Sequence, residues 1–316
     1  MTDRARVVVL DPVDPGALAA LAEHHEVVER IHPDPAELQA LAADADALVV
    51  RSGVRITGDV IRAGRNLRVI ARAGSGIDNI DVTAARTAGV QVFNIPGASA
   101  GAVAELAVGL MLAVTRNIAL ADRQIRDGVW DKPNLKGPGL EGRVLGVVGQ
   151  GPIGSRIAAL GQGFGMRVLA ALARPSAERD RELRERGVER VGLEALLRTC
   201  DMVCLAVPLT EQTRGLVGAE QLALLGPDSY LVDVSRGGVV DQAALVRALR
   251  ERTIAGAGLD VHGQESGRPE LAGLDNVVLT PHIGATTTDA QVKVGRLLVD
   301  ELTAALAGGS ASTRVC

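Results

Sequence analysis

The chain has 316 residues, of which 47% are hydrophobic and 23% charged, so it can bury a large core and is long enough for two domains. Aromatic residues make up 1%, which predicts an aliphatic core and argues against single-stranded nucleic acid as a ligand, because bases stack on aromatic faces. A net charge of −4 without a long run of either sign also disfavours nucleic acid and anionic membranes as partners.

We expect a cytoplasmic protein. Only four consecutive apolar residues precede Asp11, too few for a secretory signal. The longest apolar stretch, residues 102–114, is too short to cross a bilayer and contains Glu105. The three cysteines lack the spacing of zinc ligands, and we expect Cys200 and Cys204 to be buried as small hydrophobic residues.

The first third of the chain alternates short apolar runs with helical stretches. Strands are predicted at residues 7–10, 47–51, 67–72 and 90–93, and helices at 14–24, 35–43, 57–63 and 81–88. The strands are continuously apolar, as expected where helices cover both faces of a parallel sheet. One long helix is predicted over about residues 99–128; it is apolar on nearly all sides, so it should be buried.

A second alternating series follows a Pro- and Gly-rich segment at residues 131–142. Strands are predicted at residues 144–148, 167–171, 202–207, 230–234, 255–259 and 277–279, and helices at 153–164, 178–186, 194–199, 219–224 and 242–251. Six strands in this alternation indicate a doubly wound domain. The final helix, at about residues 288–307, is assigned back to the first domain.

A glycine-rich turn directly follows the strand at residues 144–148 and opens a helix. In this turn, the first glycine permits the tight bend, the second lets backbone amides approach a pyrophosphate, and the third lets the helix pack closely on the sheet. A proline in the first helical turn is compatible, because its missing N–H would have no intrahelical partner. We therefore predict a dinucleotide cofactor, with glycines that serve only as a turn as the alternative. The residues concerned are Gly149, Gly151, Pro152, Ile153 and Gly154.

The fold class predicted from these patterns is α/β, with two doubly wound domains. Residues 98–287 would form a Rossmann NAD(P)-binding domain, and residues 1–97 with 288–316 a discontinuous, flavodoxin-like domain. The residues at the end of the second strand of the Rossmann domain do not decide between NAD and NADP. Leu172 stands where a ribose-binding carboxylate is expected, and Arg174, two residues later, could pair with a 2′-phosphate. NAD is slightly favoured, NADP stays open, and Arg174 could also be a solvated loop cation.

Four further motifs resemble one family. They lie at residues 72–81 (RAGSGIDNID), 234–241 (VSRGGVVD), 258–261 (GLDV) and 281–285 (PHIGA). Together they resemble the D-isomer-specific 2-hydroxyacid dehydrogenases over about residues 51–299, and within that family the D-3-phosphoglycerate dehydrogenases. The resemblance implies a substrate domain, a nucleotide domain, an active site between them and a homodimer. The chain ends soon after the last predicted helix, so we expect a short form without a regulatory C-terminal domain.

The resemblance places catalysis on Arg236, Glu265 and His282. Oxidation of an alcohol removes a hydride from carbon and a proton from oxygen, so a base that titrates near neutrality is needed, and His282 would supply it. Glu265 would stabilise the imidazolium, and Arg236 would grip the substrate carboxylate. The loop around Glu265 departs from the family, because His262 replaces a phenylalanine and Ser266 a proline; a solvated turn carboxylate is therefore the alternative for Glu265.

The resemblance also implies further cofactor contacts. They are Val207, Pro208, Thr213, Ser235, Arg236, Asp260, His282 and Gly284. Pro152 stands where the family usually has an arginine, which removes one cation from the pyrophosphate. Three other histidines, His24, His25 and His32, lie outside every motif and are expected at the surface.

Substrate contacts are predicted at the ends of two strands of the first domain. The backbone amides of Gly74, Ser75 and Gly76 could bind a carboxylate, because consecutive amides in a turn form an anion pocket. Arg51, Ser52 and Arg72 lie at the same strand ends, and the two arginines suit a phosphate or phosphonate; capping of the strands is the alternative. In the family, a basic residue at the position of Lys132 reaches the substrate of the neighbouring subunit.

These observations predict an oxidoreductase that transfers a hydride between NAD(P) and a D-2-hydroxyacid or its 2-keto acid. An anionic substrate such as 3-phosphoglycerate or a phosphonate analogue is favoured. A glyoxylate or hydroxypyruvate reductase is the alternative, and a dinucleotide-sensing, corepressor-like interaction protein is the alternative from another class.

Overall fold

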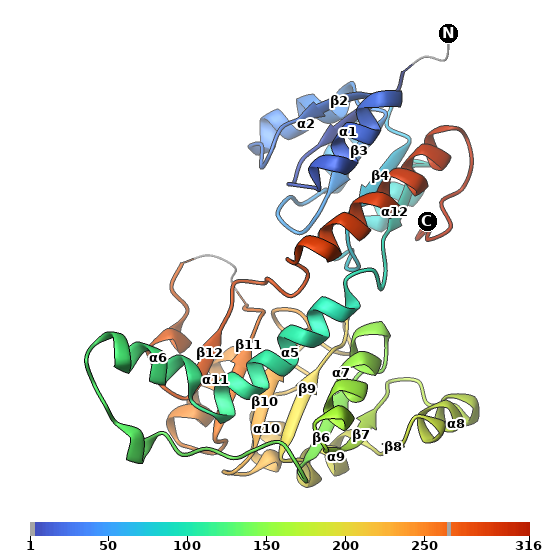
Figure 1. Ribbon diagram of the computed structural model, residues 1–316. Coiled ribbons are helices and arrows are strands. Elements are labelled where there is room, and N and C mark those ends of the chain that lie inside the picture. The colour runs from blue at the N-terminus through green and yellow to red at the C-terminus, as the bar shows by residue number, and fades with distance from the viewer. Residues whose placement is uncertain (1–3, 264–266) are drawn as a thin grey trace. The chain divides into compact units, whose positions relative to one another are not determined.

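The computed structural model describes residues 4–263 and 267–316, and the chain divides into two compact units (Figure 1). One unit comprises Met1–Ser99 and Thr286–Cys316, and the other comprises Ala100–Ala285. Each unit is a parallel sheet with helices on both faces. This architecture confirms the predicted α/β fold class.

The sheet of the first unit has five described strands in the order β2-β1-β3-β4-β5. All pairings are parallel, and Val8 lies opposite Val28 on one side and Leu48 on the other. This order is that of flavodoxin-like sheets, in which ligands bind where the order reverses, between the first and third strands. The strands are β1 (Arg6–Val9), β2 (Glu26–Glu29), β3 (Ala47–Val50), β4 (Val69–Arg72) and β5 (Gln91–Asn94).

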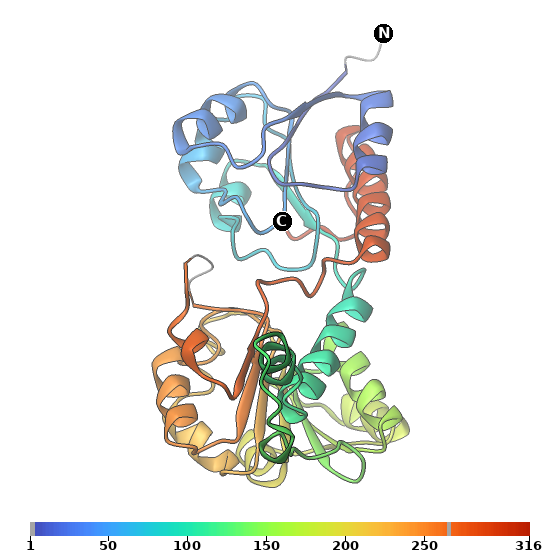
Figure 2. The same cartoon turned by 60° about the vertical axis from the view of Figure 1, so that its left-hand side comes forward.

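Helices cover both faces of this sheet. On one face, α1 (Pro15–His24) and α12 (Thr288–Leu306) lie side by side (Figure 2), and Leu298 of α12 shares a buried cluster with Val7 and Val9. On the other face, α2 (Pro35–Ala43), α3 (Gly58–Ala63) and α4 (Val82–Thr87) pack in a cluster that includes Val8. Successive valines of β1 therefore point to opposite buried faces, which explains why the strand is continuously apolar.

The second unit has a sheet of seven described strands in the order β12-β11-β10-β9-β6-β7-β8, all parallel. Numbered within the unit, this is 7-6-5-4-1-2-3, the Rossmann order with one added strand. The order reverses between β6 and β9. The strands are β6 (Val144–Val148), β7 (Arg167–Ala171), β8 (Val188–Arg190), β9 (Met202–Leu205), β10 (Tyr230–Asp233), β11 (Gly256–Leu259) and β12 (Val277–Leu279).

Two buried layers lie on opposite faces of the second sheet. One contains α5 (Ala100–Thr115), α7 (Pro152–Gly163) and α8 (Ala177–Glu185), and α5 and α7 lie against each other. The other contains α9 (Leu193–Thr199), α10 (Ala219–Leu225) and α11 (Gln242–Arg250). Short 3₁₀ helices lie at η1 (Lys132–Asn134) and η2 (Glu270–Gly273).

Two strands escaped the sequence prediction, β2 and β8. Both lie at a sheet edge, and each has charged residues that leave no continuous apolar run: Glu26 and Glu29 in β2, Glu189 and Arg190 in β8. An edge strand packs less surface than a central one, so its pattern of hydrophobic residues is weak.

The single long helix predicted over residues 99–128 is wrong. The structure has α5 and then α6 (Ile118–Arg126), bent by 63° at a break where Asn117 adopts a left-handed conformation with φ 52°. The helix was expected to be buried, but Glu105 is exposed on α5 and α6 has no buried residue. Within the described residues, no single helix is long and apolar enough to cross a membrane; α5 and α6 meet that test only when taken together across their bend.

Candidate active site

The glycine-rich turn after β6 has the geometry of a phosphate cradle. Gly149 has φ 94°, and a Cβ there would lie 2.5 Å from the carbonyl oxygen of Ala206. A Cβ on Gly154 would overlap the carbonyl oxygen of Gly149, so α7 can approach the turn only because this residue is glycine. By contrast, open space surrounds the Cβ position of Gly151. The turn is therefore closed toward the protein and open on the side where a ligand would bind.

The first turn of α7 offers uncapped backbone amides. Its N-cap is Gly151, so no side chain occupies the N–H groups there. Gln150 Nε2 is buried and has no hydrogen-bond partner among the described residues. Amides at a helix N-terminus bind anions through their N–H groups and the helix dipole. These features fit the pyrophosphate of a dinucleotide.

At the end of β7, the two residues that bear on cofactor choice differ in environment. Leu172 is half-buried against the hydrophobic cluster beneath the sheet, whereas Arg174 is exposed. Leu172 itself offers no carboxylate for the ribose hydroxyls, and the Arg174 side chain lies in solvent.

The loop after β9 is held by one threonine. Thr213 Oγ1 donates a hydrogen bond to the carbonyl oxygen of Pro208 (2.6 Å) and accepts one from the Thr210 backbone amide (2.8 Å). The hydroxyl, predicted to contact the cofactor, is thus already used to shape its own loop. The neighbouring Val207 lies against the Cβ position of Gly149, so the β9 loop and the glycine turn are in contact.

The buried carboxylate of Asp260, just after β11, organises the turn that carries His282. Its Oδ1 accepts hydrogen bonds from Thr280 Oγ1 (2.6 Å) and the Ile283 amide (2.8 Å), and its Oδ2 accepts one from the Gly284 amide (2.8 Å). The His282 amide donates to the Asp260 carbonyl oxygen at 2.9 Å. His282 itself has φ 55°, an uncommon conformation for a residue with a side chain. Asp260, at the end of the neighbouring strand β11, therefore holds the turn that carries His282.

His262 adds a second tie to the same turn. Its Nε2 lies 2.9 Å from the carbonyl oxygen of Thr280, so the ring donates from this nitrogen. Its Nδ1 is buried with no hydrogen-bond partner among the described residues. The role of His262 was open from the sequence; the structure makes it a link between the chain after β11 and the chain after β12.

Arg236 and Ser235 follow β10. The Arg236 Nη1 donates to the Ser235 carbonyl oxygen (2.7 Å), and the side chain is half-buried. Ser235 is buried, and its amide donates to Asp233 Oδ1 at 2.9 Å, while its hydroxyl donates to the same oxygen. Burial, with a smaller contribution from the nearby Asp260 carboxylate, raises the pKa of the Asp233 carboxyl to about 7, against the lowering effect of these hydrogen bonds. Sequence reasoning missed Asp233, although an acidic residue inside an apolar strand was a visible signal.

Asp233 also lines a small cavity. The cavity has a volume of about 20 Å³, and Gln242 and His262 are among its lining residues. A volume of this size can hold one water molecule.

The structure brings most of the predicted residues of the second unit to one edge of its sheet. Arg236, Asp260 and His282 follow the adjacent strands β10, β11 and β12, and the glycine turn follows β6. Ligands bind at the carboxyl ends of strands in such sheets, where the strand order reverses. The spacing between β10 and β12 is about 10 Å, two strand separations. Glu265 lies outside the described residues.

The predicted substrate residues of the first unit lie at the carboxyl edge of that unit's own sheet. A Cβ on Gly74 (φ 147°) would overlap Arg72 Nη1, so the guanidinium lies directly over this turn. Asn94 Nδ2 donates to the Ser75 carbonyl oxygen (2.5 Å) and holds the turn in place. Ser52 is exposed and Gly76 is half-buried after their strands.

Other predicted residues lie away from these turns. Lys132 is exposed in η1. Cys200 and Cys204 are buried, as predicted, and burial raises the pKa of both thiols, that of Cys200 to about 12. These thiols are therefore unreactive at neutral pH. Among the described residues there is no cluster of His, Cys, Asp and Glu that could hold a metal ion.

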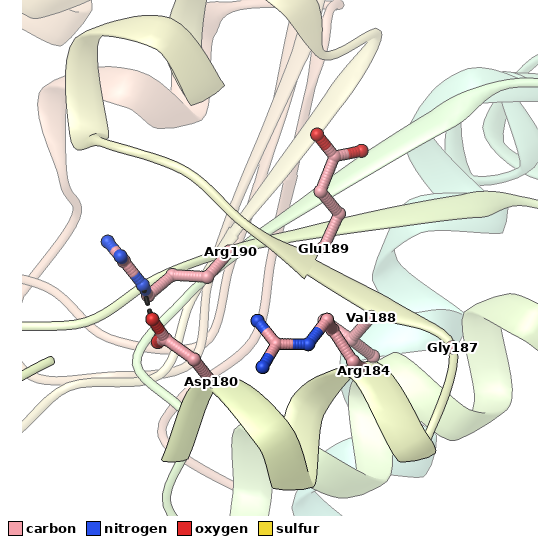
Figure 3. Close-up of a pocket in the computed structure, with 6 residues that line it drawn as sticks. All are labelled: Asp180, Arg184, Gly187, Val188, Glu189 and Arg190. Carbon is pink, nitrogen blue, oxygen red and sulfur yellow. Dashed lines mark hydrogen bonds and ion pairs between the residues drawn. The ribbon is translucent and has the colours of Figure 1, made fainter. Parts of the chain in front are cut away.

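A hollow of about 340 Å³ lies elsewhere in the second unit, between α8 and β8 (Figure 3). Its lining is mainly charged, and Arg190 and Asp180 pair across it at 2.5 Å. β8 is one of the two edge strands of the described sheet and lies two positions from β6, the strand that precedes the glycine turn. None of the predicted site residues lines this hollow.

Comparison with known proteins defines the class. Residues 108–284 match the family model described as the D-isomer specific 2-hydroxyacid dehydrogenase, NAD binding domain. The chain therefore belongs to the D-isomer specific 2-hydroxyacid dehydrogenase family, and it is an NAD(P)-dependent oxidoreductase acting on CH–OH donors.

Three relatives place it within the family. The chain is 43% identical over 305 residues to the hydroxypyruvate reductase of Thermotoga maritima, with 95% of this chain and 97% of that protein covered. It is 41% identical over 308 residues to the D-3-phosphoglycerate dehydrogenase of Methanocaldococcus jannaschii, covering 96% of this chain but 58% of that protein. The chain thus spans a little more than half the length of that relative. A solved structure of an NADPH-dependent glyoxylate/hydroxypyruvate reductase from Sinorhizobium meliloti, in complex with NADP and malonate, aligns with TM-score 0.87 and 32% identity over 99% of this chain and 97% of that one.

Proposed function

We propose that the protein transfers a hydride between a nicotinamide cofactor and a D-2-hydroxyacid or its 2-keto acid, with a second anionic group on the substrate. The observation that carries this proposal is the shared edge of the second sheet, where Arg236, Asp260 and His282 follow β10, β11 and β12 on the same edge as the glycine turn after β6.

The glycine turn after β6 indicates where the cofactor would bind. The turn from Gly149 to Gly154 and the open amides of α7 would hold the pyrophosphate, and the bound nicotinamide supplies the hydride acceptor or donor. Asp260 would hold the turn of His282 against the same edge. We slightly favour NAD as the cofactor. NADP is the alternative, and Arg174 would then pair with its 2′-phosphate.

His282 and Arg236 then have distinct tasks. The His282 imidazole takes the proton from the substrate hydroxyl during oxidation and returns it during reduction. The Arg236 guanidinium binds the substrate carboxylate with two parallel hydrogen bonds and so orients the reacting carbon. We propose that Glu265 stabilises the imidazolium of His282, as the resemblance to the family implies.

A phosphate or phosphonate is the second anionic group that we favour, because Arg51 follows β3 and Arg72 ends the neighbouring β4, close in sequence to the amides of Gly74, Ser75 and Gly76. This makes 3-phosphoglycerate a candidate substrate. Hydroxypyruvate is the second candidate, favoured by the relative that matches this chain over 97% of its own length.

We also propose a homodimer. Exposed apolar side chains gather on α6 and the segment after it: Ile118 (52%), Ile125 (51%), Val129 (46%) and Trp130 (84%). Exposed apolar side chains close together in the chain are typical of protein interfaces. Lys132 follows directly and would reach a partner's substrate; light scattering on the purified protein measures the oligomeric state.

The test of the proposed function uses purified protein with NADH or NADPH and a panel of 2-keto acids. We expect consumption of reduced cofactor, and we expect His282→Ala to abolish turnover while dinucleotide binding persists. Normal turnover in that variant would show that another group is the base. A strong preference for NADH that Arg174→Ala leaves unchanged would reject the phosphate role of Arg174.

A further inference from the structure

The last residues of the sequence pair with an edge of the first sheet. After α12 the chain turns back on itself (Figure 1), and residues 311–316, here called the tail, run antiparallel to β5. The amide of Val315 donates to the carbonyl oxygen of Val92 (2.7 Å), and the amide of Val92 donates to the carbonyl oxygen of Cys316 (3.2 Å). Because β5 is an edge strand of the described sheet, the tail satisfies backbone groups that have no partner within the sheet.

The tail is fixed to its own unit by packing and by α12. Ala311 is 4% exposed and belongs to the buried cluster that contains Phe93 and Leu298. The Ser312 amide donates to Glu301 Oε2 on α12 (2.6 Å), and the Ser312 hydroxyl donates to the other oxygen of the same carboxylate. The tail therefore has a defined position, unlike chain ends that are not tied down.

One side chain of the tail reaches the carboxyl end of β5. Thr313 Oγ1 donates a hydrogen bond to the carbonyl oxygen of Asn94, the last residue of this strand, at 2.5 Å. Thr313 and Asn94 are both half-buried, so the bond is partly shielded from water, which strengthens it. The backbone at the end of β5 is thus held from the tail.

The end of β5 in turn holds the turn after β4. Asn94 Nδ2 donates to the carbonyl oxygen of Ser75 (2.5 Å), and the amide of the next residue, Ile95, donates to the carbonyl oxygen of Gly74 (2.9 Å). Two carbonyl groups of the turn are therefore fixed by two consecutive residues of one strand end. Within the part of the chain that the structure describes, the amides of Ser75 and Gly76 donate to no protein acceptor, so they are available to an anion.

We propose that Thr313 is a positioning residue for the substrate: through Asn94 it fixes the turn whose amides bind an anionic group of the substrate. This inference rests on the proposed function, which it deepens by extending the substrate site to the tail. Without the Thr313 hydroxyl, the Asn94 carbonyl loses this donor, and the turn samples a wider range of positions. Ordering such a turn costs conformational entropy when the substrate binds, which lowers the affinity. The amides bind the substrate and the transition state alike, so the loss falls on KM and leaves kcat unchanged.

The first test is steady-state kinetics of the full-length protein with hydroxypyruvate as the varied substrate and saturating reduced cofactor. Thr313→Val replaces the hydroxyl with a methyl group of similar size. We expect the KM for hydroxypyruvate to rise about fivefold, the effect of losing one hydrogen bond between neutral groups, with kcat and the KM for the cofactor unchanged. Thr313→Ser keeps the hydroxyl and should retain the wild-type KM.

Thr87→Val is the matched control. Thr87 Oγ1 also donates to a backbone carbonyl oxygen of the first unit, that of Thr83 (3.0 Å), but this bond lies on the exposed surface of α4. The control variant loses a hydrogen bond of the same kind away from the turn, so we expect the wild-type KM for hydroxypyruvate.

Amide hydrogen exchange of the unliganded protein measures the same coupling without turnover. We expect exchange in residues 73–78 to be up to about fivefold faster in Thr313→Val than in the wild type, because the lost bond makes local opening of the turn easier. Thr313→Ser should exchange at the wild-type rate. Outside the turn, β5 and the tail, exchange should be unchanged in all variants.

The proposal is overturned if Thr313→Val retains either the wild-type KM for hydroxypyruvate or the wild-type exchange in residues 73–78. It is also overturned if exchange rises throughout the first unit, or if kcat and both KM values change together, because a purely structural role of the tail would have that effect. Failure of the proposed function gives a different result, since the wild-type protein then turns over no 2-keto acid. The exchange measurement still decides in that case whether Thr313 holds the turn.

Discussion

The carboxyl of Asp233 gives a stability prediction with a definite sign. The side chain is buried at the end of β10, and burial raises its pKa from 3.8 to about 7. Between about pH 4 and about pH 7, the folded protein therefore keeps a proton that the unfolded chain has released. In this window, the contribution of Asp233 to the free energy of unfolding falls by about 1.4 kcal/mol for each pH unit, and above about pH 7 it stays constant.

Asp233→Asn removes this titration and keeps an oxygen that can accept the hydrogen bonds of Ser235. The stability of the variant relative to the wild type should therefore rise with pH, by up to about 3 kcal/mol between about pH 5 and about pH 8, and then level off. The cavity of about 20 Å³ beside the carboxyl can hold a water that would solvate the charge, so the measured gain should be below this limit.

The assay is thermal and urea denaturation of both proteins across this pH range, read as differences between them because a chain with two units need not unfold in one step. Asp228→Asn is the control, since Asp228 is exposed just before the same strand and should not alter the pH dependence. Stability curves of wild type and Asp233→Asn that run parallel at all pH values would refute the reasoning, because they would mean that Asp233 does not titrate differently in the folded state.

Three further changes follow from the geometry. Gly154→Ala should destabilise the protein by about 1–3 kcal/mol and abolish dinucleotide binding in a fluorescence titration, because the new Cβ overlaps the Gly149 carbonyl oxygen, whereas Gly163→Ala on the same helix meets open space and should be tolerated. Asp260→Ala should lower the free energy of unfolding by about 3 kcal/mol in urea, since three donors lose their acceptor; an unchanged urea midpoint would contradict this account. A maleimide at neutral pH should label Cys316 in the native protein and the other two cysteines only after denaturation, and mass spectrometry would show any earlier labelling.

The sequence predicts the central elements of the fold because central parallel strands are buried on both faces. Val7 to Val9 show this directly: their alternate side chains enter different clusters, so every position must be apolar. An edge strand need not be apolar at every position, and β2 was missed because its charged residues interrupt the apolar pattern. The break at Asn117 was missed for a different reason, since one left-handed residue between α5 and α6 does not interrupt the spacing of apolar residues along the chain.

Prediction of the site depended on which residues carry a local signal. The glycine turn is visible because its spacing, preceding strand and following helix all occur within one short segment. Two contacts join residues about 20 positions apart in the chain: Asp260 with the turn around His282, and Asp11 with His32. No sequence spacing predicts contacts of this kind. Such pairs become visible only when the order of the strands is known.

The discontinuous first unit has a consequence for synthesis on the ribosome. α12 supplies Leu298 and Leu302 to a core whose other members include Val7 and Val9, so the part of the protein made first cannot complete its interior until the last helix has emerged. The second unit, Ala100–Ala285, is contiguous and can fold meanwhile. At typical elongation rates the delay is about 10–40 s. During that interval one face of the nascent five-stranded sheet is covered by α1 but lacks α12, and a chaperone that shields apolar surface would act there.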